Sequence, residues 1–160
     1  IRLVKGSHII TKKLYKADVA FTFQNTDKRI IFVIPYKGKF SLIGTTEIEV
    51  KSPENQGISK KEIRYLIKSV NNYLNNEISE KDIVDTYSGV RPLIEDFNAA
   101  SKVTRDYVFD LKIINKLPLL NIYGGKLTTY RKLSEKVLFD LKKFLPKTKK
   151  GPWTDKKKLF

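Results

Sequence analysis

Four short segments of this sequence carry side chains that could do chemistry on an anionic ligand. They are KGSHI with His8, SGVRPL with Arg91, TRDY with Arg105 and GGKLTTYR with Lys126. Histidine is the one side chain here whose ordinary pKa lies near neutrality, so it suits proton transfer. Arginine presents a planar, bidentate donor to phosphate or carboxylate, and only six of the 32 basic residues are arginine. Each arginine is therefore a candidate anion ligand.

The segment GGKLTTYR joins an apolar run, LPLLNIY, to a helical pattern. Its two glycines let a ligand approach the backbone, and the N-terminus of a helix stabilises negative charge. Gly-Gly between a strand and a helix is equally often a simple tight turn. The motif alone leaves both interpretations open.

The composition predicts a globular domain and is compatible with a reducing compartment. The chain has 160 residues, 41% of them hydrophobic, no cysteine and one histidine. This excludes disulfides and multi-histidine metal sites, so we expect no metal. No apolar run approaches the roughly 20 residues of a membrane span, and no secretory signal opens the chain. Methionine is absent, so we expect that Ile1 is not the native start and that the chain is a piece of something longer, or a gene remnant.

The net charge of +15 favours anionic partners. Charge alone supports a nucleic-acid-binding domain, but no known nucleic-acid motif accompanies it, so nucleic acid is not expected. The basic tail with Trp153 and Phe160 could contact an anionic membrane surface, although a solvated tail is the more common outcome. We expect a cytoplasmic protein, with peripheral contact at the inner face of the cell membrane left open.

The hydrophobic periodicity predicts an α+β fold with a mostly antiparallel sheet and two main helices. Ser59 and Glu62 form a capping box at the start of the first helix, whose apolar stripe should pack on the sheet. No Gly-x-Gly-x-x-Gly or phosphate-loop motif occurs, so a Rossmann fingerprint is missing. We expect one domain over residues 1–146 and a tail over 147–160. The predicted strands are 17–24, 30–36, 40–50, 82–94, 104–114 and 119–125, and the predicted helices are 59–76 and 127–144.

Six motifs in order, VKGSHI, FVIPY, IGTTE, YSGVRPL, TRDY and GGKLTTYRKL, resemble one known family. From about Arg2 to Leu145 the chain is similar to the C-terminal half of the catalytic region of FAD-dependent, quinone-linked glycerol-3-phosphate dehydrogenases, in the D-amino-acid-oxidase-like superfamily. Two departures are mild: Glu47 replaces an aspartate, and TDKR replaces a DGR turn. The larger departure is the missing N-terminal half with its Rossmann segment.

The resemblance implies oxidation of glycerol 3-phosphate at C2, with FAD as cofactor and quinone as the electron acceptor. It implies that His8 is the base and that Arg91 and Arg105 bind the phosphate, Arg91 also counting as catalytic. Lys126, counted as catalytic too, would stabilise negative charge on the reduced flavin, and the backbone at Gly125, Lys126, Leu127 and Thr128 would contact the flavin.

Alternatives remain for each assignment. His8 could be structural, Arg91 could bond carbonyl groups at a strand end, and Arg105 could form a surface ion pair with Asp106. Thr45 and Thr46 are predicted to be strand residues rather than ligands. The chain could also be a non-catalytic remnant, or it could belong to a relative that oxidises amines or amino acids. Without the missing half we expect no activity.

Overall fold

The computed structural model describes residues 1–54, 56–94, 106–147, 151 and 153–158, and the chain divides into two compact units. Unit 1 is Ile1–Val103 and unit 2 is Thr104–Phe160. Every strand pair is antiparallel, and the two longest helices follow strands, so the predicted α+β class is confirmed. The predicted division at residue 146 is a separate matter and stays a prediction. Arg105 lies outside the described residues.

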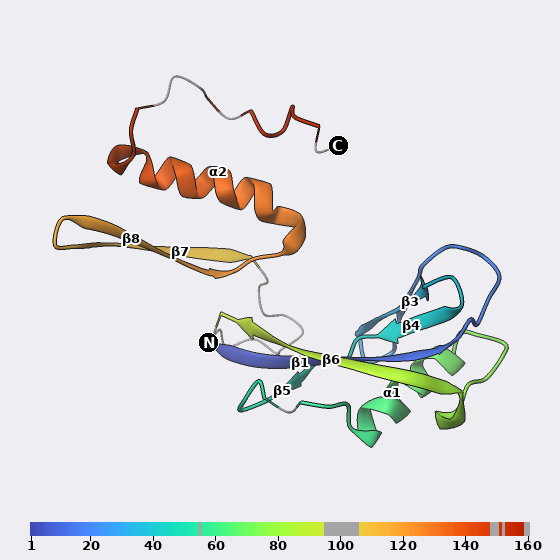
Figure 1. Cartoon of the computed structure of the whole chain (residues 1–160). Coiled ribbons are helices and arrows are strands. Elements are labelled where there is room, and N and C mark those ends of the chain that lie inside the picture. The colour runs from blue at the N-terminus through green and yellow to red at the C-terminus, as the bar shows by residue number, and fades with distance from the viewer. Residues whose placement is uncertain (55, 95–105, 148–150, 152, 159–160) are drawn as a thin grey trace. The chain divides into compact units, whose positions relative to one another are not determined.

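Unit 1 is built on a six-stranded sheet whose central strand is β1 (Figure 1). The strand β6 runs along one edge of β1, while β4 and β5 share the other edge. The outer strands β3 and β2 continue the sheet beyond β4. The strands are β1 (Arg2–Lys12), β2 (Phe21–Gln24), β3 (Ile30–Tyr36), β4 (Phe40–Gly44), β5 (Ile48–Glu49) and β6 (Ile83–Leu93).

The central strand β1 was not predicted from the sequence. It reads RLVKGSHIITK, and its middle carries Lys5, Gly6, Ser7 and His8, which lack the β-branched and aromatic character typical of strands. Long-range packing overrides this weak local preference, because β1 pairs with three other strands and six of its residues from Val4 to Ile10 are buried.

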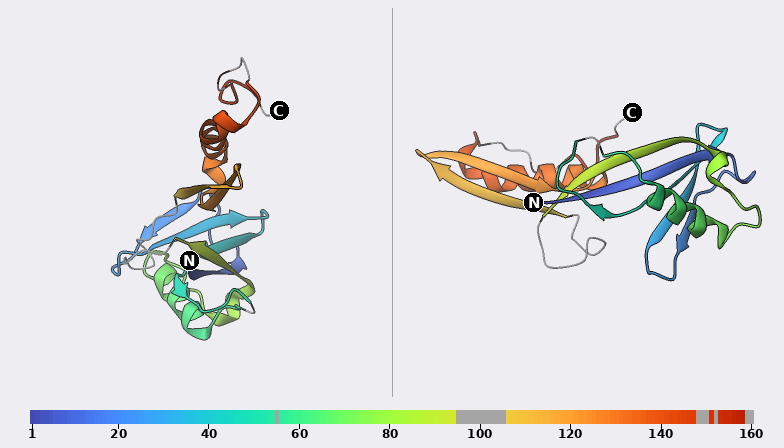
Figure 2. Two further views of the ribbon diagram at one scale, coloured as in Figure 1. Left: turned by 90° about the vertical axis from the view of Figure 1, so that its left-hand side faces the viewer. Right: turned by 90° about the horizontal axis from the view of Figure 1, so that it is seen from below.

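The helix α1 (Lys60–Asn71) covers one face of this sheet (Figures 1 and 2). Its capping box is present as predicted, with the Ser59 side chain accepting from the Glu62 N–H. Each fully buried aliphatic side chain contributes about 1.5–3 kcal/mol of transfer free energy. The core beneath the helix comprises Ile9, Ile31, Val33, Ile43, Leu66, Val70 and Ile78.

The helix α1 ends at Asn71, five residues before the predicted end. The side chain of Asn71 donates to the carbonyl of Ile78 at 2.9 Å and accepts from the Ile78 N–H at 3.0 Å. This pair of bonds ties the helix end to the returning chain. Ser79 then leads into the short 3₁₀ turn η1 (Glu80–Asp82) that precedes β6.

Unit 2 consists of a hairpin followed by a helix. The strands β7 (Tyr107–Ile114) and β8 (Leu117–Gly124) are joined at Asn115 and Lys116, which both have positive φ, as a two-residue hairpin turn requires. The turns η2 (Leu127–Thr129) and η3 (Lys142–Phe144) flank α2 (Tyr130–Leu141). The predicted helix over 127–144 is thus an α-helix with a 3₁₀ turn at each end. None of the described residues of unit 2 is fully buried.

Candidate active site

The two faces of β1 carry different chemistry. Successive side chains of a strand point to opposite faces, so Lys5, Ser7 and Ile9 face α1 while Gly6 and His8 face away from it. Residues paired directly across a ladder share a face. We call the side of the sheet opposite α1 the His8 face.

Strand register brings Arg91 and Tyr87 onto the His8 face. His8 pairs with Tyr87 on β6 and with Gly44 on β4, and Val4 pairs with Arg91. The structure therefore places two of the predicted site residues, His8 and Arg91, on one surface of unit 1. Tyr87 was not predicted as a neighbour of His8, because β1 itself was not predicted and the register could not be drawn.

The imidazole of His8 lies over Gly44. A Cβ atom at this glycine would stand 2.1 Å from His8 Cδ2, which no side chain could tolerate without moving the ring. On the other side, the Tyr87 ring centroid lies 5.8 Å from that of His8. Glycine on one strand and tyrosine on the other thus define the space that the imidazole occupies.

His8 is uncharged at neutral pH in this environment. Burial lowers the pKa of His8 below 6.5, and the positive charge of Arg91 lowers it further. Its Nδ1 atom is buried and has no hydrogen-bond partner among the described residues. A neutral imidazole can accept a proton from a hydroxyl group at a ring nitrogen that the substrate reaches.

The guanidinium of Arg91 lies over Gly6. A Cβ atom at this glycine would stand 2.5 Å from Arg91 Nη2 and 2.7 Å from Thr45 Oγ1. Arg91 Nη2 donates to Thr45 Oγ1 at 3.4 Å, a long contact. The two glycines, Gly6 and Gly44, therefore make room on the sheet for the guanidinium and the imidazole respectively.

Apart from Arg105, the remaining predicted site residues lie in unit 2, where the chain turns from β8 into α2. Gly125 has φ +102°, a conformation that side-chain-bearing residues rarely adopt. Residues 125–128, from this glycine to Thr128, are exposed. The Lys126 N–H donates to Thr129 Oγ1 at 3.3 Å, and this hydroxyl donates to the Lys126 carbonyl at 2.9 Å. One of the predicted backbone donors is thus already engaged within the turn, and the flavin contacts stay a prediction.

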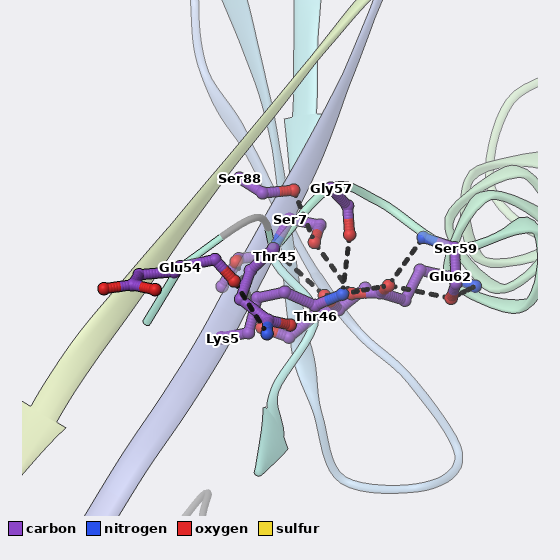
Figure 3. Close-up of polar contacts among 10 residues, drawn as sticks. Lys5, Ser7, Thr45, Thr46, Glu54, Gly57, Ser59, Glu62 and Ser88 are labelled. Carbon is purple, nitrogen blue, oxygen red and sulfur yellow. Dashed lines mark hydrogen bonds and ion pairs between the residues drawn. The ribbon is translucent and has the colours of Figure 1, made fainter. Parts of the chain in front are cut away.

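Behind the His8 face lies a buried polar cluster, shown in Figure 3, that the sequence analysis missed. Glu62 is 2% exposed, and its two carboxylate oxygens accept five hydrogen bonds of 2.7–2.8 Å. Lys5 Nζ supplies one of them as an ion pair and also donates to the Gly57 carbonyl at 2.8 Å. Satisfying every acceptor in this way is what permits a carboxylate to be buried. The other donors are Ser7 Oγ, Thr46 Oγ1, Ser59 Oγ and the Ser59 N–H.

The connection between β4 and β5 carries Thr46 into this cluster. The sequence predicted one continuous strand over 40–50, which would put Thr46 on the same face as Gly44 because side chains alternate along a strand. That prediction is wrong at residues 45–47, which are not in a strand. Thr46 instead turns to the opposite side of the sheet, where Glu62 binds its hydroxyl at 2.8 Å and outweighs the local preference for an extended pattern.

Unfolding at acid pH should report on Glu62. Burial raises the pKa of its carboxyl group, but the hydrogen bonds from Lys5, Ser59 and Ser7 outweigh burial and lower that pKa from 4.5 to about 2. A depressed pKa stabilises the folded state above about pH 4.5, and this contribution is lost as pH falls towards 2. We expect the free energy of unfolding to lose about 3 kcal/mol over that range through Glu62.

Urea titrations of the chain at pH 7 and at pH 2 would measure this loss. The matched variant is Glu62→Gln, which should be less stable at pH 7 and should depend less on pH. Equal pH dependence in both proteins would contradict the role given to the Glu62 carboxylate.

The chain is similar to a known protein family and to a solved structure. Residues 1–131 match the model of the family described as FAD dependent oxidoreductase. The solved structure of a glycerol-3-phosphate dehydrogenase from Bacillus halodurans, complexed with FAD, is similar with a TM-score of 0.66 and 26% identity. The similarity covers 89% of this chain and 27% of that one.

Three curated relatives extend the comparison. The D-erythritol 1-phosphate dehydrogenase of Brucella abortus is 47% identical over 96% of this chain and 31% of its own length. The aerobic glycerol-3-phosphate dehydrogenase of Escherichia coli K12 is 49% identical over 86% of this chain and 28% of its own. The glycerol-3-phosphate dehydrogenase of Pseudomonas aeruginosa is 45% identical over 98% and 31%. The chain therefore spans less than a third of these relatives, and the predicted resemblance and its link to FAD are confirmed.

Proposed function

Because this chain belongs to the FAD dependent oxidoreductase family, we propose that it forms the substrate-binding part of a flavoenzyme that oxidises a phosphorylated polyol, first of all glycerol 3-phosphate. The observation that carries the proposal is the placement of a neutral His8 and a cationic Arg91 on one face of the sheet. The oxidation of an alcohol phosphate needs both a proton acceptor and an anion ligand.

The residues of the His8 face divide the work between them. His8, neutral at pH 7, takes the proton of the C2 hydroxyl group onto its imidazole. Arg91 binds the phosphate through its planar guanidinium, with Thr45 orienting it. Arg105 is proposed as a second phosphate ligand by resemblance. Removing the hydroxyl proton raises electron density at C2 and so favours loss of hydride from that carbon.

The turn at residues 125–128 fits the edge of a flavin ring. It is exposed, and Gly125, whose positive φ favours glycine, brings no side chain of its own to the backbone there. A bound FAD would supply the hydride acceptor, and quinone would take up the electrons. Lys126 would place a positive charge beside the flavin ring, and the backbone of Gly125, Leu127 and Thr128 would orient that ring.

Unit 2 exposes apolar side chains that a further part of the enzyme would cover. The exposed residues of the hairpin include Ile113, Ile114, Leu117 and Leu119, between 46% and 69% accessible. A surface of this kind marks a contact with other protein. We propose that the dinucleotide-binding half, which the resemblance implies for the complete enzyme, packs here and that catalysis requires it.

The cellular setting is proposed from the resemblance and from the basic tail. No helix in the described part of the chain is long and apolar enough to cross a membrane. Trp153 is half exposed, and Lys157 Nζ lies 5.3 Å from the centroid of its ring. A lysine-rich segment with an exposed tryptophan suits peripheral contact with anionic lipid at the cytoplasmic face, where quinone could be reached.

The Brucella abortus relative supports a second candidate substrate, D-erythritol 1-phosphate, which also joins a phosphate to an oxidisable hydroxyl group. A chimera separates the two candidates: residues 1–160 replace the matching segment of the Escherichia coli aerobic enzyme. We expect the highest kcat/KM with glycerol 3-phosphate. The kcat/KM for glycerol, which lacks the phosphate group, should be roughly 10⁴-fold lower, because the cationic side chains of the site then have no anion to bind.

The other possible results of the chimera assay each indicate a different function. A higher kcat/KM with D-erythritol 1-phosphate would assign that substrate instead. Equal reaction of glycerol would remove the phosphate-binding proposal. A chimera that binds FAD but oxidises none of these compounds, and whose flavin no amine or amino acid reduces, would favour a non-catalytic remnant.

A further inference from the structure

Three consecutive residues connect the candidate active site to the buried cluster. Gly44 lies beneath the His8 ring, Thr45 Oγ1 contacts Arg91 on the His8 face, and Thr46 Oγ1 donates to Glu62 on the opposite side of the sheet. This segment is the connection between β4 and β5, which both pair with β1. A displacement of Thr46 would therefore change the surroundings of both His8 and Arg91.

The hydroxyl of Thr46 is fixed in orientation. It has one proton, which it donates to Glu62 Oε1 at 2.8 Å, and its lone pair accepts from the Ser7 N–H at 3.0 Å. The Thr46 N–H in turn donates to the Ser7 carbonyl at 3.3 Å. Three hydrogen bonds thus fasten this one residue, which is 2% exposed, to β1 and to α1.

The fixed position of Thr46 also restrains Thr45, the residue before it. Thr45 Oγ1 donates to the Thr46 carbonyl at 3.1 Å, which leaves its lone pairs for the guanidinium of Arg91. Side-chain hydrogen bonds of both threonines therefore restrain this stretch of backbone. Ser88 adds a further restraint from β6, since its hydroxyl donates to Ser7 Oγ at 2.9 Å (Figure 3).

We propose that Glu62 is a positioning residue for the active site, acting through Thr46 to hold Thr45 and Gly44 against Arg91 and His8. The inference deepens the proposed function and rests on it for its catalytic meaning. Helix α1, on the far side of the sheet, thereby fixes the geometry of the His8 face.

A buried ion pair is a costly way to obtain stability alone. Well-packed apolar side chains of similar volume often give equal or greater stability, whereas a paired carboxylate fixes the direction of each of its donors. Lys5 and Glu62 are 7% and 2% exposed, so solvent can do little to replace a lost bond. The charged pair of Lys5 and Glu62 therefore suits a region in which hydrogen-bond donors must keep a fixed direction. A proton-transfer site needs such fixed geometry.

The single histidine of the chain gives a direct test by NMR. The Cε1 proton signal of His8 is followed against pH in the 160-residue chain. Among the residues that the structure describes, the charged or titratable side chains that face it are Arg91 and Tyr87, both on β6. We expect Thr46→Val to free Thr45, to let Arg91 move away, and to raise the pKa of His8 towards its ordinary value. Thr46→Ser keeps the hydroxyl and should titrate like the parent chain.

A purely structural role predicts a different outcome. In that case Thr46→Val and Glu62→Gln would lower the free energy of unfolding but leave the His8 titration unchanged, and the inference would be overturned. Should Thr46→Val fail to fold, Ser59→Ala, which removes one of the five donors to Glu62, provides the milder variant for the same titration.

Kinetics of the chimera give the second readout. We expect Thr46→Val to lower kcat/KM by up to about 10²-fold through misplacement of the reacting groups, and Thr46→Ser to restore it. A chimera without any activity would refute the proposed function, whereas an unchanged His8 titration would refute the positioning role. The two failures are therefore distinguishable.

Discussion

Replacement of His8 by glutamine is expected to lower kcat of the chimera by about 10²–10⁴-fold, the usual contribution of a general base. The imidazole is neutral at pH 7 because burial and then Arg91 lower its pKa, and glutamine cannot accept the proton in its place. KM for glycerol 3-phosphate should change little, since the phosphate ligands remain. Stopped-flow measurement of flavin reduction would give the rate without interference from quinone.

The pH dependence separates a base from a merely structural histidine. A base with a lowered pKa is active above that pKa and loses activity as pH falls through it, so kcat/KM of the parent chimera should decline on the acidic side. His8→Gln should lack this limb. A variant that keeps both its rate and its acidic limb would show that another group removes the proton.

Replacement of Arg91 by alanine should raise KM for glycerol 3-phosphate by roughly 10–150-fold. A hydrogen bond to a charged group contributes about 1.5–3 kcal/mol, and the phosphate loses this bond in the variant. Arg91→Lys should recover only part of the loss, because an ammonium group cannot bind two phosphate oxygens in a plane. Steady-state kinetics of the chimera would measure both variants.

Arg29→Ala is the matched control for Arg91. Arg29 lies in the same unit, 42% exposed, and its guanidinium is 3.8 Å from Asp27. Its removal should leave KM unchanged, since exposed pairs contribute little. An unchanged KM in both variants would remove the phosphate-binding role of Arg91, whereas a loss confined to kcat would indicate that it acts only in the transition state.

Much of the fold could be predicted because local patterns and packing agree over most of the chain. The capping box at Ser59 and the apolar stripe of α1 are short-range signals, and both are present. A turn also follows the predicted strand 104–114, although β8 begins at Leu117, two residues before the predicted start. The strand β1 carries no such signal. Its polar centre is stabilised by partners far along the chain, such as Ser88, 81 residues from Ser7, which no local pattern reveals.

The candidate site shows the same division. His8 and Arg91 could be selected by residue type and motif, and strand register then placed them on one face. The role of Glu62 could not be predicted, because a glutamate at the third position of a helix is ordinarily exposed. Lys5 and Ser7 are spaced by two residues along the chain and share a strand face with the core residue Ile9. This spacing is the one sequence signal that could have suggested a buried polar partner.

Anaerobic flavin reduction tests the proposed function most directly. The chimera, loaded with FAD, is mixed with glycerol 3-phosphate in the absence of quinone, and the visible absorption band of the oxidised flavin is followed. We expect the band of the chimera to bleach. We expect no such change when the 160-residue chain by itself is mixed with FAD and glycerol 3-phosphate. A chimera that retains FAD and whose band persists at saturating glycerol 3-phosphate would contradict the proposal that this chain provides a working substrate site.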